Sequence, residues 1–503
     1  MFQEHKFKIV RHAIKNIWML IFPILRAIRS YTLDFDAFYI WITGIWIDVI
    51  VIIAIIAFGY FRWTFTWCRM GKHHIRLNTG IFIKTETAIA YDRISAVTAE
   101  YPFWLRPFKA VRVRIKTRAK KIGSGDMTLI VRYKDLSRLY DVIPIMRSEV
   151  YGAASEKLSK EEKKLRKELG RSPRWYEMLF YSLAFSSSLS GVIYLAALIF
   201  NAGRIISENA KENMDNVYRI ANDMSENVSE KIPVSIPPVI IILLLILAGT
   251  WLFSFVSNLL RYCGFSIKKS ETTLCVRTGL LTKRIFCIDI KKINYIDIRQ
   301  NFFMKIFHVG SVNINCSGYG ASKFEHPVLL PMLTRSKINM LLEQLGTEKQ
   351  ICDNEIRPEK WSFWSYISIP FYLLSLMLTA DYITAKLFPD IANIIMFIAI
   401  MEVIPMVWFM IVKVLAFFTT GAALKDSYSC IRYSRFFMFH ILLVDNDRPV
   451  KIQVFQDAID EKIHRARLDL YFTSEKPKAN KIKGLNINDA KIIIRKYEQA
   501  AKK

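Results

Sequence analysis

The sequence predicts a polytopic α-helical membrane protein with about six spans, arranged as three hairpins, and three cytoplasmic β-sandwich or barrel domains, each capped by a C-terminal helix. Three observations predict this fold: long apolar blocks, a polar stretch after each pair of blocks, and an internal repeat. Mean hydropathy is +0.21 although 23% of the 503 residues are charged, so apolar and charged residues are segregated. That segregation excludes a single soluble globule, a disordered chain and a simple fibrous repeat.

The apolar blocks are long enough for transmembrane helices, which need about 20 mostly apolar residues. Five blocks reach this length with at most one charged residue each, and they cover residues 37–61, 175–200, 238–260, 361–380 and 391–412. A sixth, Asn16 to Leu25, is uncharged but short, and fits a short span, a re-entrant piece or an interfacial helix. Its basic start resembles a signal peptide, but no small-residue cleavage site follows, so we interpret it as an uncleaved anchor.

Charge predicts the orientation of these spans. The connections within the pairs, residues 30–36, 204–236 and 381–390, together hold five more acidic than basic residues, whereas the whole chain has a net charge of +27. Because basic segments stay on the cytoplasmic side, we expect a multi-pass protein of the cell membrane with its long polar stretches in the cytoplasm. The positive charge also predicts an anionic partner.

The polar stretches are related to one another. At a fixed offset of 199 residues the first stretch aligns with the second without a gap, and nine of the 37 positions from Thr79 to Ile115 are identical. The aligned aromatic residues are Phe103 with Phe302 and Phe108 with Phe307. The third stretch, from about Thr419, aligns only with gaps. The sequence therefore predicts three copies of a hairpin followed by a polar domain.

Each polar stretch starts with strand patterns and ends with a helix pattern. Val111, Val113 and Ile115 alternate with basic residues, which is the period of a half-buried strand. Tight turns are expected where Gly follows Thr, at Gly80 and Gly279, because Gly tolerates positive φ. The closing helices are expected at residues 136–150, 333–345 and 488–500.

These patterns divide the chain into hairpins, β domains and linkers. Hairpins are expected at residues 1–61, 174–261 (with an outer loop at 204–236) and 361–418. The β domains are expected at residues 62–150, 262–346 and 419–503, the last of them divergent. The linkers are expected at residues 151–173, as a charged helix, and 347–360.

The first polar stretch, RLNTGIFIKTETAIAYDRISAVTAEYPFWLRPFKAVRVRI, resembles the bacterial pleckstrin-homology-like (PH-like) membrane proteins. The shared pattern is a strand ending in Gly, a basic and Ile-rich stretch, an aromatic segment and a Val/Ile strand. The second copy, from Val276 to Cys316, fits this pattern, whereas the third, from Arg448 to Phe472, lacks the Gly turn and much of the aromatic segment. With three copies on three hairpins, the whole chain resembles the YdbT type of this family. The resemblance implies a PH-like sandwich capped by a C-terminal helix, an inner-membrane setting and no catalytic residues.

A basic run without any acidic residue lies between Trp104 and Lys121. Its members are Arg106, Lys109, Arg112, Arg114, Lys116, Arg118, Lys120 and Lys121. The four from Arg112 to Arg118 share one strand face, here called the basic stripe. The equivalent face of the second copy is uncharged (Ser311, Asn313, Asn315 and Ser317), so the fold does not require this charge.

Three interpretations of the basic stripe stand side by side: a solvated strand face, contact with anionic phospholipids of the inner leaflet, or contact with an acidic partner protein. Near an anionic leaflet each basic residue contributes about 1 kcal/mol. The neighbouring aromatic residues fit either dipping into the membrane or packing in a core, and for Phe108 and Phe307 we favour the core, because both copies keep Phe there. Nucleic acid is not expected as a partner, since the stripe has no interleaved aromatic residues for stacking.

Two acidic residues lie in the middle of predicted spans. Asp48 and Glu402 are costly there and are functional candidates for a proton or ion path. The alternative is a pair or hydrogen bond inside the helical bundle, for example between Asp48 and Arg26, or a protonated acid.

Signatures of enzymes and cofactors are absent from the sequence. There is no nucleophile elbow, no phosphate-binding glycine loop and no dinucleotide-binding motif. None of the seven cysteines forms a CxxC pair, so we expect no metal and reduced, structural thiols; the spacing of 12 between Cys263, Cys275 and Cys287 suits hairpin strands. The sequence thus predicts no catalytic residue and no cofactor.

The favoured function is a non-enzymatic membrane protein whose PH-like domains contact the inner leaflet or another membrane protein, in envelope maintenance or lipid handling. One rival is a transporter or channel that uses Asp48 and Glu402. A second rival is a membrane scaffold that assembles a protein complex.

Overall fold

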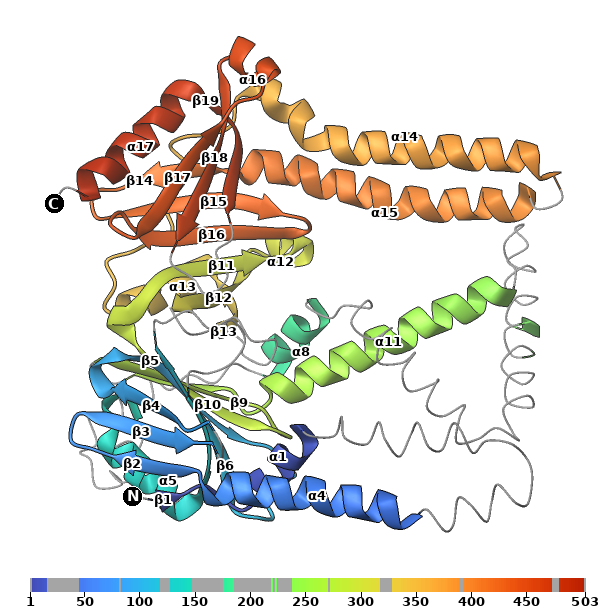
Figure 1. Cartoon of the computed structure of the whole chain (residues 1–503). Coiled ribbons are helices and arrows are strands. Elements are labelled where there is room, and N and C mark those ends of the chain that lie inside the picture. The colour runs from blue at the N-terminus through green and yellow to red at the C-terminus, as the bar shows by residue number, and fades with distance from the viewer. Residues whose placement is uncertain are drawn as a thin grey trace. The chain divides into compact units, whose positions relative to one another are not determined.

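The computed structural model describes residues 2–15, 45–80, 83–117, 127–146, 175–184, 219, 222–223, 238–269, 272–316, 328–389, 392–472 and 479–501 (Figure 1). The chain forms two compact units. Unit 1 comprises Met1–Ser172, Gly264–Ile293 and Cys316–His326, and unit 2 comprises Pro173–Cys263, Asn294–Asn315 and Pro327–Lys503. The second copy of the repeat is therefore divided, with its first strands in unit 1 and most of its remaining strands in unit 2.

The described residues of unit 1 form two sheets. Sheet A has the order β1-β2-β3-β4, and its strands are β1 (Phe2–Gln3), β2 (Trp67–Met70), β3 (His74–Thr79) and β4 (Thr85–Ala90). Sheet B has the order β7-β6-β5-β10-β9-β8, and its strands are β5 (Ile94–Tyr101), β6 (Ala110–Thr117), β7 (Met127–Arg132), β8 (Ser266–Lys269), β9 (Thr273–Thr278) and β10 (Lys283–Asp289). The helices are α1 (Lys8–Lys15), α4 (Ile45–Thr64) and α5 (Tyr133–Val142).

The repeat seen in the sequence is also present in the backbone. Strands β9, β11 (Ile293–Gln300) and β12 (Val309–Cys316) begin and end 199 residues after β3, β5 and β6. The expected Gly turns have positive φ, 120° at Gly80 and 94° at Gly279. A Cβ on Gly80 would lie 1.9 Å from the carbonyl oxygen of Ile83, so only glycine fits that turn.

Sheet B joins two copies of the repeat edge to edge. Its strands β5, β6 and β7 come from the first copy and β8, β9 and β10 from the second, and β5 pairs antiparallel with β10 from Lys283 opposite Tyr101 to Ile288 opposite Ala96. The hydrophobic core of unit 1 crosses this seam: Val113 and Ile115 of β6 share one cluster with Cys287 of β10. The first copy and the first strands of the second copy are therefore parts of one folded body.

A buried carboxylate lies at the seam of sheet B. Glu100 on β5 lies 3.5 Å from a guanidinium nitrogen of Arg112, 3.2 Å from one of Arg114 and 3.8 Å from one of Arg284. Arg112 and Arg114 belong to β6 of the first copy, whereas Arg284 belongs to β10 of the second. Because all three guanidinium groups are mostly shielded from water, their shared counter-charge stabilises the joined sheet.

Unit 2 repeats this arrangement with sheet C, in the order β13-β12-β11-β16-β15-β14. Its further strands are β13 (Val328–Thr334), β14 (Gly421–Leu424), β15 (Tyr428–Arg435) and β16 (Met438–Asp445). Sheet D has the order β17-β18-β19, with β17 (Pro449–Phe455), β18 (Arg465–Phe472) and β19 (Asn480–Asn486). The helices are α8 (Trp175–Ala184), α11 (Pro238–Tyr262), α12 (Phe302–Ile306), α13 (Arg335–Gln344), α14 (Phe363–Leu387), α15 (Ala392–Thr419), α16 (Ala458–Lys462) and α17 (Ile487–Ala501).

The seam of sheet C also carries a buried acid. Strand β11 of the second copy pairs with β16 from Tyr295 opposite Val444 to Gln300 opposite Phe439. Asp297 on β11 accepts from Arg299 at 2.6 Å and lies 3.0 Å from Nδ1 of His440 on β16. Burial raises the pKa of Asp297, but His440 and Arg299 outweigh burial and hold this pKa at about 2.

The prediction of about six spans in three hairpins, with three separate β-sandwich domains, is wrong. In the described residues three helices are long and apolar enough to cross a membrane, at Leu245–Tyr262, Lys360–Leu387 and Glu402–Thr419. The predicted span at 37–61 has a shorter apolar helix, Val49–Thr64, and the one at 175–200 is described only as α8. The segment from Asn16 to Leu25 lies outside the described residues. The sandwich prediction fails because an alternating pattern shows which face of a strand is buried and not which strand it pairs with.

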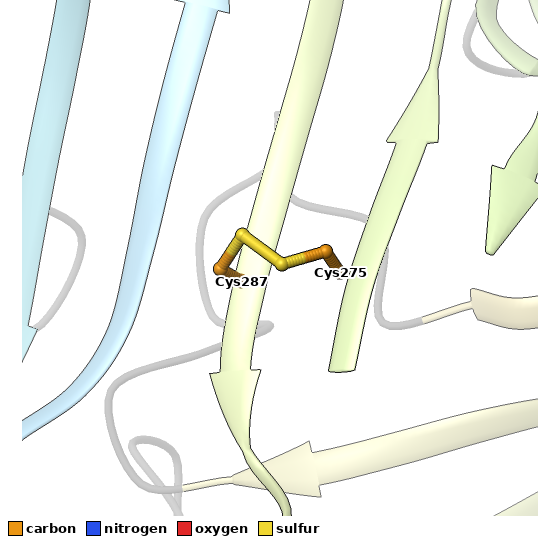
Figure 2. Close-up of a disulfide and its surroundings, with 2 residues drawn as sticks. All are labelled: Cys275 and Cys287. Carbon is orange, nitrogen blue, oxygen red and sulfur yellow. A yellow bond between two sulfur atoms is a disulfide. The ribbon is translucent and has the colours of Figure 1, made fainter. Parts of the chain in front are cut away.

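A disulfide joins Cys275 on β9 to Cys287 on β10, in the directly opposite register (Figure 2). The expected placement of these two cysteines on a hairpin is confirmed. The expectation of reduced thiols is wrong for this pair, because the register brings their Cα atoms to 4.2 Å, close enough for a bond.

We predict that Glu100→Gln destabilises the protein by about 3–5 kcal/mol, because it leaves three guanidinium groups in sheet B without a counter-charge. Thermal unfolding of the full chain in detergent measures the loss. Glu86→Gln is the matched control: Glu86 pairs with Arg76 at 3.3 Å and both are about half exposed, so its loss is expected to stay below about 1 kcal/mol. Equal small losses for both variants would contradict a stabilising role of the seam carboxylate.

A second prediction concerns pH. The pKa of Asp297 is about 2, below its ordinary value of 3.8, so its contribution to stability is present above pH 3.8 and is lost as the pH falls through 2. Asp297→Asn is therefore expected to lower stability by about 2 kcal/mol at pH 7. The difference in unfolding midpoint between the natural chain and this variant should shrink from pH 4 to pH 2. A difference that stays constant over this range would show that the charge of Asp297 is not the cause.

Candidate functional site: a cationic pocket and aromatic loops at the base of a helical hairpin

The loop between β11 and β12 carries aromatic side chains onto an apolar helix. It contains α12, and the ring centroid of Phe302 lies 4.3 Å from that of Trp408 on α15. The ring of Phe303 lies 5.7 Å from Trp408. Phe307 contacts Phe180 of α8 at 5.3 Å. This end of sheet C, called here the aromatic end, is thus attached to a helix long and apolar enough to span a membrane.

The turn between β15 and β16 adds to the same end, since Gln300 at the end of β11 pairs with Phe439 at the start of β16. Phe436 at this turn is 68% exposed, and the ring of Phe437 lies 5.0 Å from Phe409 of α15. Exposed aromatic side chains beside an apolar helix are typical of a membrane–water interface.

The length of α15 indicates where this interface lies. With 28 residues the helix is about 42 Å long, whereas the hydrocarbon layer is about 30 Å thick. The helix is thus longer than this layer, and Lys413 lies in its last two turns, near its end at Thr419. Long basic side chains near the end of a spanning helix extend toward water. In Figure 1, α14 and α15 lie side by side and end at sheets C and D.

A pocket of about 390 Å³ lies at this level, between the two helices, the β15–β16 turn and β19. Its size is within the range of ligand sites, about 300–1,000 Å³. Four basic side chains line it: Lys413, Arg435, Lys481 and Lys483. Its lining also includes three apolar side chains, Ile369, Phe409 and Phe436, and the hydroxyl-bearing residues Tyr366, Thr420, Tyr433 and Ser434. The pocket therefore combines positive charge with apolar surface.

Most of the basic side chains of the pocket have no carboxylate partner among the described residues, and Lys413 lies over the Phe409 ring at 5.1 Å from its centroid. Lys481 lies 3.7 Å from Asp469, while no carboxylate among the described residues lies within 4.0 Å of Lys413, Arg435 or Lys483. Burial lowers the pKa of Lys483, and the neighbouring Arg467 and Lys481 lower it further. An anion bound here would offset this mutual repulsion.

The corresponding end of sheet B has the same composition. Phe103 is 60% and Phe108 is 54% exposed on the loop between β5 and β6. Phe108 and Trp104 contact Phe7, which directly precedes α1. Our expectation of core packing for Phe108 is wrong, and it is wrong also for Phe307, which is 59% exposed. Two copies keep Phe at these positions although the side chains stay at the surface.

Most of the described basic run has partners inside unit 1. Arg112 and Arg114 pair with Glu100, and Arg112 also lies over the Trp104 ring at 5.5 Å from its centroid. Lys116 is buried, so the solvated strand face is not what the structure shows for these three residues. Arg106 donates to the carbonyl oxygens of Leu280 and Leu281 at 2.8 and 3.1 Å.

Of the remaining four members of the basic run, the structure describes one. Lys109 is exposed, with a left-handed backbone (φ 50°), and Arg118, Lys120 and Lys121 lie outside the described residues. Contact of the run with lipid or with an acidic partner stays a prediction.

The two acids of the predicted spans also have different outcomes. The backbone of Asp48 lies in α4, and its side chain is outside the description. Glu402 lies on α15 and Asp381 on α14, and each has one buried carboxylate oxygen without a hydrogen-bond partner among the described residues. A role of Glu402 in a proton or ion path stays a prediction.

The pocket was not predicted from the sequence. A signal existed in the alternation of Lys481 and Lys483, which places both on one strand face, and in the turn Arg435-Phe436-Phe437, which joins a cation to exposed aromatic residues. The sequence does not show that this turn and β19 lie close to Lys413 in the folded chain. In the described residues no group of three or more His, Cys, Asp or Glu side chains is placed to hold a metal ion.

Comparisons with known proteins agree with a membrane protein that carries PH-like domains. Residues 21–143 and 226–349 match the family described as "Bacterial PH domain". The chain is similar to the UPF0699 transmembrane protein YdbT of Bacillus subtilis (strain 168), with 22% identity over 348 residues, which are 68% of this chain and 67% of that protein. No solved structure matches. The family match comprises two copies and ends at residue 349, before the third predicted copy.

Proposed function

We propose that this chain is a non-enzymatic protein of the cell membrane whose PH-like β domains lie in the cytoplasm and dock on the inner leaflet, in envelope maintenance or lipid handling. The observation that supports the docking is the attachment of the aromatic end of sheet C to α15 through Phe302, Phe303 and Phe437. Apolar contact with a spanning helix brings this end of the sheet to the membrane surface. Burial of aromatic side chains in the interface then stabilises the docked state.

The end of sheet B supports the same function for the other unit. Phe103 and Phe108 stand 199 residues before Phe302 and Phe307 and occupy the equivalent loop. Leu280 and Leu281 are both more than half exposed. They lie at the same end of sheet B, because Lys283, which follows them, pairs with Tyr101 at the end of β5. Together these side chains form an apolar surface that the leaflet would cover.

The charge distribution supports the cytoplasmic orientation. The net charge of +27 is carried by the polar stretches, whereas the connections at 30–36, 204–236 and 381–390 are acidic overall. A transporter or channel that uses Asp48 and Glu402, and a scaffold for a protein complex, remain alternative hypotheses.

The docking is tested by the depth of a probe at the end of sheet B. Phe103→Cys in the full chain is labelled with an environment-sensitive fluorophore, and the protein is reconstituted in nanodiscs that contain phosphatidylglycerol. We expect a blue-shifted emission that nitroxide-labelled lipids quench, because the label enters the interface.

The matched control is Asp92→Cys, which lies before β5 at the other end of sheet B, about 26 Å away along the strand. Its label should emit as in water and resist quenching, and the unsubstituted chain measures the background from native thiols. Equal emission and quenching at the two positions would refute docking through the aromatic loops.

A further inference from the structure

We propose that the pocket at the base of the α14–α15 hairpin binds the phosphate of one anionic glycerophospholipid. Lys413, Arg435 and Lys483 hold the phosphate, and Phe409 and Ile369 contact the start of the acyl chains. This site deepens the proposed function, on which it rests, since it gives the docked domain a specific lipid. It is distinct from the basic stripe, whose described members Arg112, Arg114 and Lys116 lie on β6 in unit 1.

The first argument is charge. Four basic side chains surround a space of about 390 Å³, and among the described residues only Lys481 of these four has a carboxylate within 4.0 Å, that of Asp469, which also pairs with Arg467. Placing like charges together at a partly buried site is unfavourable unless an anion joins them. A phosphate group carries negative charge and several acceptor oxygens, so it can accept from three cationic donors at once.

The second argument is position, which favours a lipid over a free phosphate ion. Ile369 and Phe409 belong to helices α14 and α15 at the membrane side of the pocket, whereas Lys481 and Lys483 belong to β19 of sheet D. Three of the four cations line the pocket from β15 and β19, and Lys413 is the one cation that lines it from the helices, beside Phe409. Apolar side chains on the helices and most of the charge on the strands match a lipid, whose acyl chains and phosphate are arranged in the same order. A free phosphate ion has no apolar group that could contact Ile369 and Phe409.

The hydroxyl groups of the pocket complete this match. Tyr366 already donates to the carbonyl oxygen of Lys483 at 3.0 Å, which joins α14 to β19 and fixes the wall of the site. Ser434 and Thr420 also line the pocket, and Thr420 donates to the carbonyl oxygen of Ala416 at 2.7 Å. The walls are thus held by hydrogen bonds that do not depend on a ligand, as in a preformed binding site.

The test measures lipid retention by the full chain in detergent. Native mass spectrometry follows titration with phosphatidylglycerol, with phosphatidylcholine and with inorganic phosphate. We expect one phosphatidylglycerol per chain to bind well below the concentration at which phosphatidylcholine binds, and inorganic phosphate at millimolar concentration not to displace it. The double variant Lys413→Gln/Lys483→Gln should weaken phosphatidylglycerol binding roughly 30-fold, since each lysine contributes a factor of about 5.

The matched control is Lys491→Gln/Arg495→Gln, which removes the same charge from the exposed side of α17 and should retain the lipid. Thermal unfolding of the lipid-free variants confirms that each is folded. Binding that is unchanged in the pocket variant, or equal displacement by inorganic phosphate, would overturn the lipid site. The two proposals can fail separately: a water-exposed label at Phe103→Cys refutes docking of sheet B, whereas loss of specific retention refutes only the pocket.

Discussion

Main-chain hydrogen bonding between strands from successive stretches of the chain is the interaction on which the rest of the structure depends. Strand β5 of the first copy pairs with β10 of the second, and β11 of the second copy pairs with β16, which lies where a third copy is predicted. An unpaired edge strand exposes a row of donors and acceptors that invites association with other chains. Pairing β5 with β10 gives each of these strands a partner on the side that would otherwise be an open edge. The two stretches of chain therefore depend on one another for their fold.

The pairings of β5 with β10 and of β11 with β16 also explain where the buried acidic side chains lie. Glu100 faces Arg284 across one seam, and Asp297 faces His440 across the other. A buried carboxylate is tolerated only with a counter-charge. Glu100 has Arg112 and Arg114 of its own copy besides Arg284, and Asp297 has Arg299 on its own strand besides His440. The arginines of the basic stripe that the structure describes therefore stabilise sheet B. The equivalent face on β12 is uncharged, and the buried acid of sheet C, Asp297 on β11, pairs with Arg299 of the same strand.

The same pairing gathers the apolar loops. Since neighbouring strands are antiparallel, the loop after β5 meets the turn before β10, and the loop after β11 meets the turn before β16. Phe103 thus lies at one end of sheet B with Leu281, and Phe302 at one end of sheet C with Phe437. In unit 2 this end contacts α15, and the cationic pocket forms where the turn, the helix and β19 meet. The order of the strands in the sheets therefore determines where the aromatic loops gather and where the pocket forms.

The sequence alone determined the local helices, strands and turns, and it determined that the chain has apolar segments long enough for a membrane protein. The alternation at Val111, Val113 and Ile115 located β6, the turn at Gly80 required glycine, and the block at 238–260 is α11. These properties depend on neighbours along the chain, so a local pattern records them.

The tertiary structure decided which strands pair, how many described helices are long enough to span, and which basic side chains stay uncompensated. Lys413, Arg435 and Lys483 are far apart in sequence and meet only because α15, β15 and β19 pack together. Contacts between distant segments leave no periodic trace in the sequence, and this is the physical reason why the pocket became visible only in the folded chain.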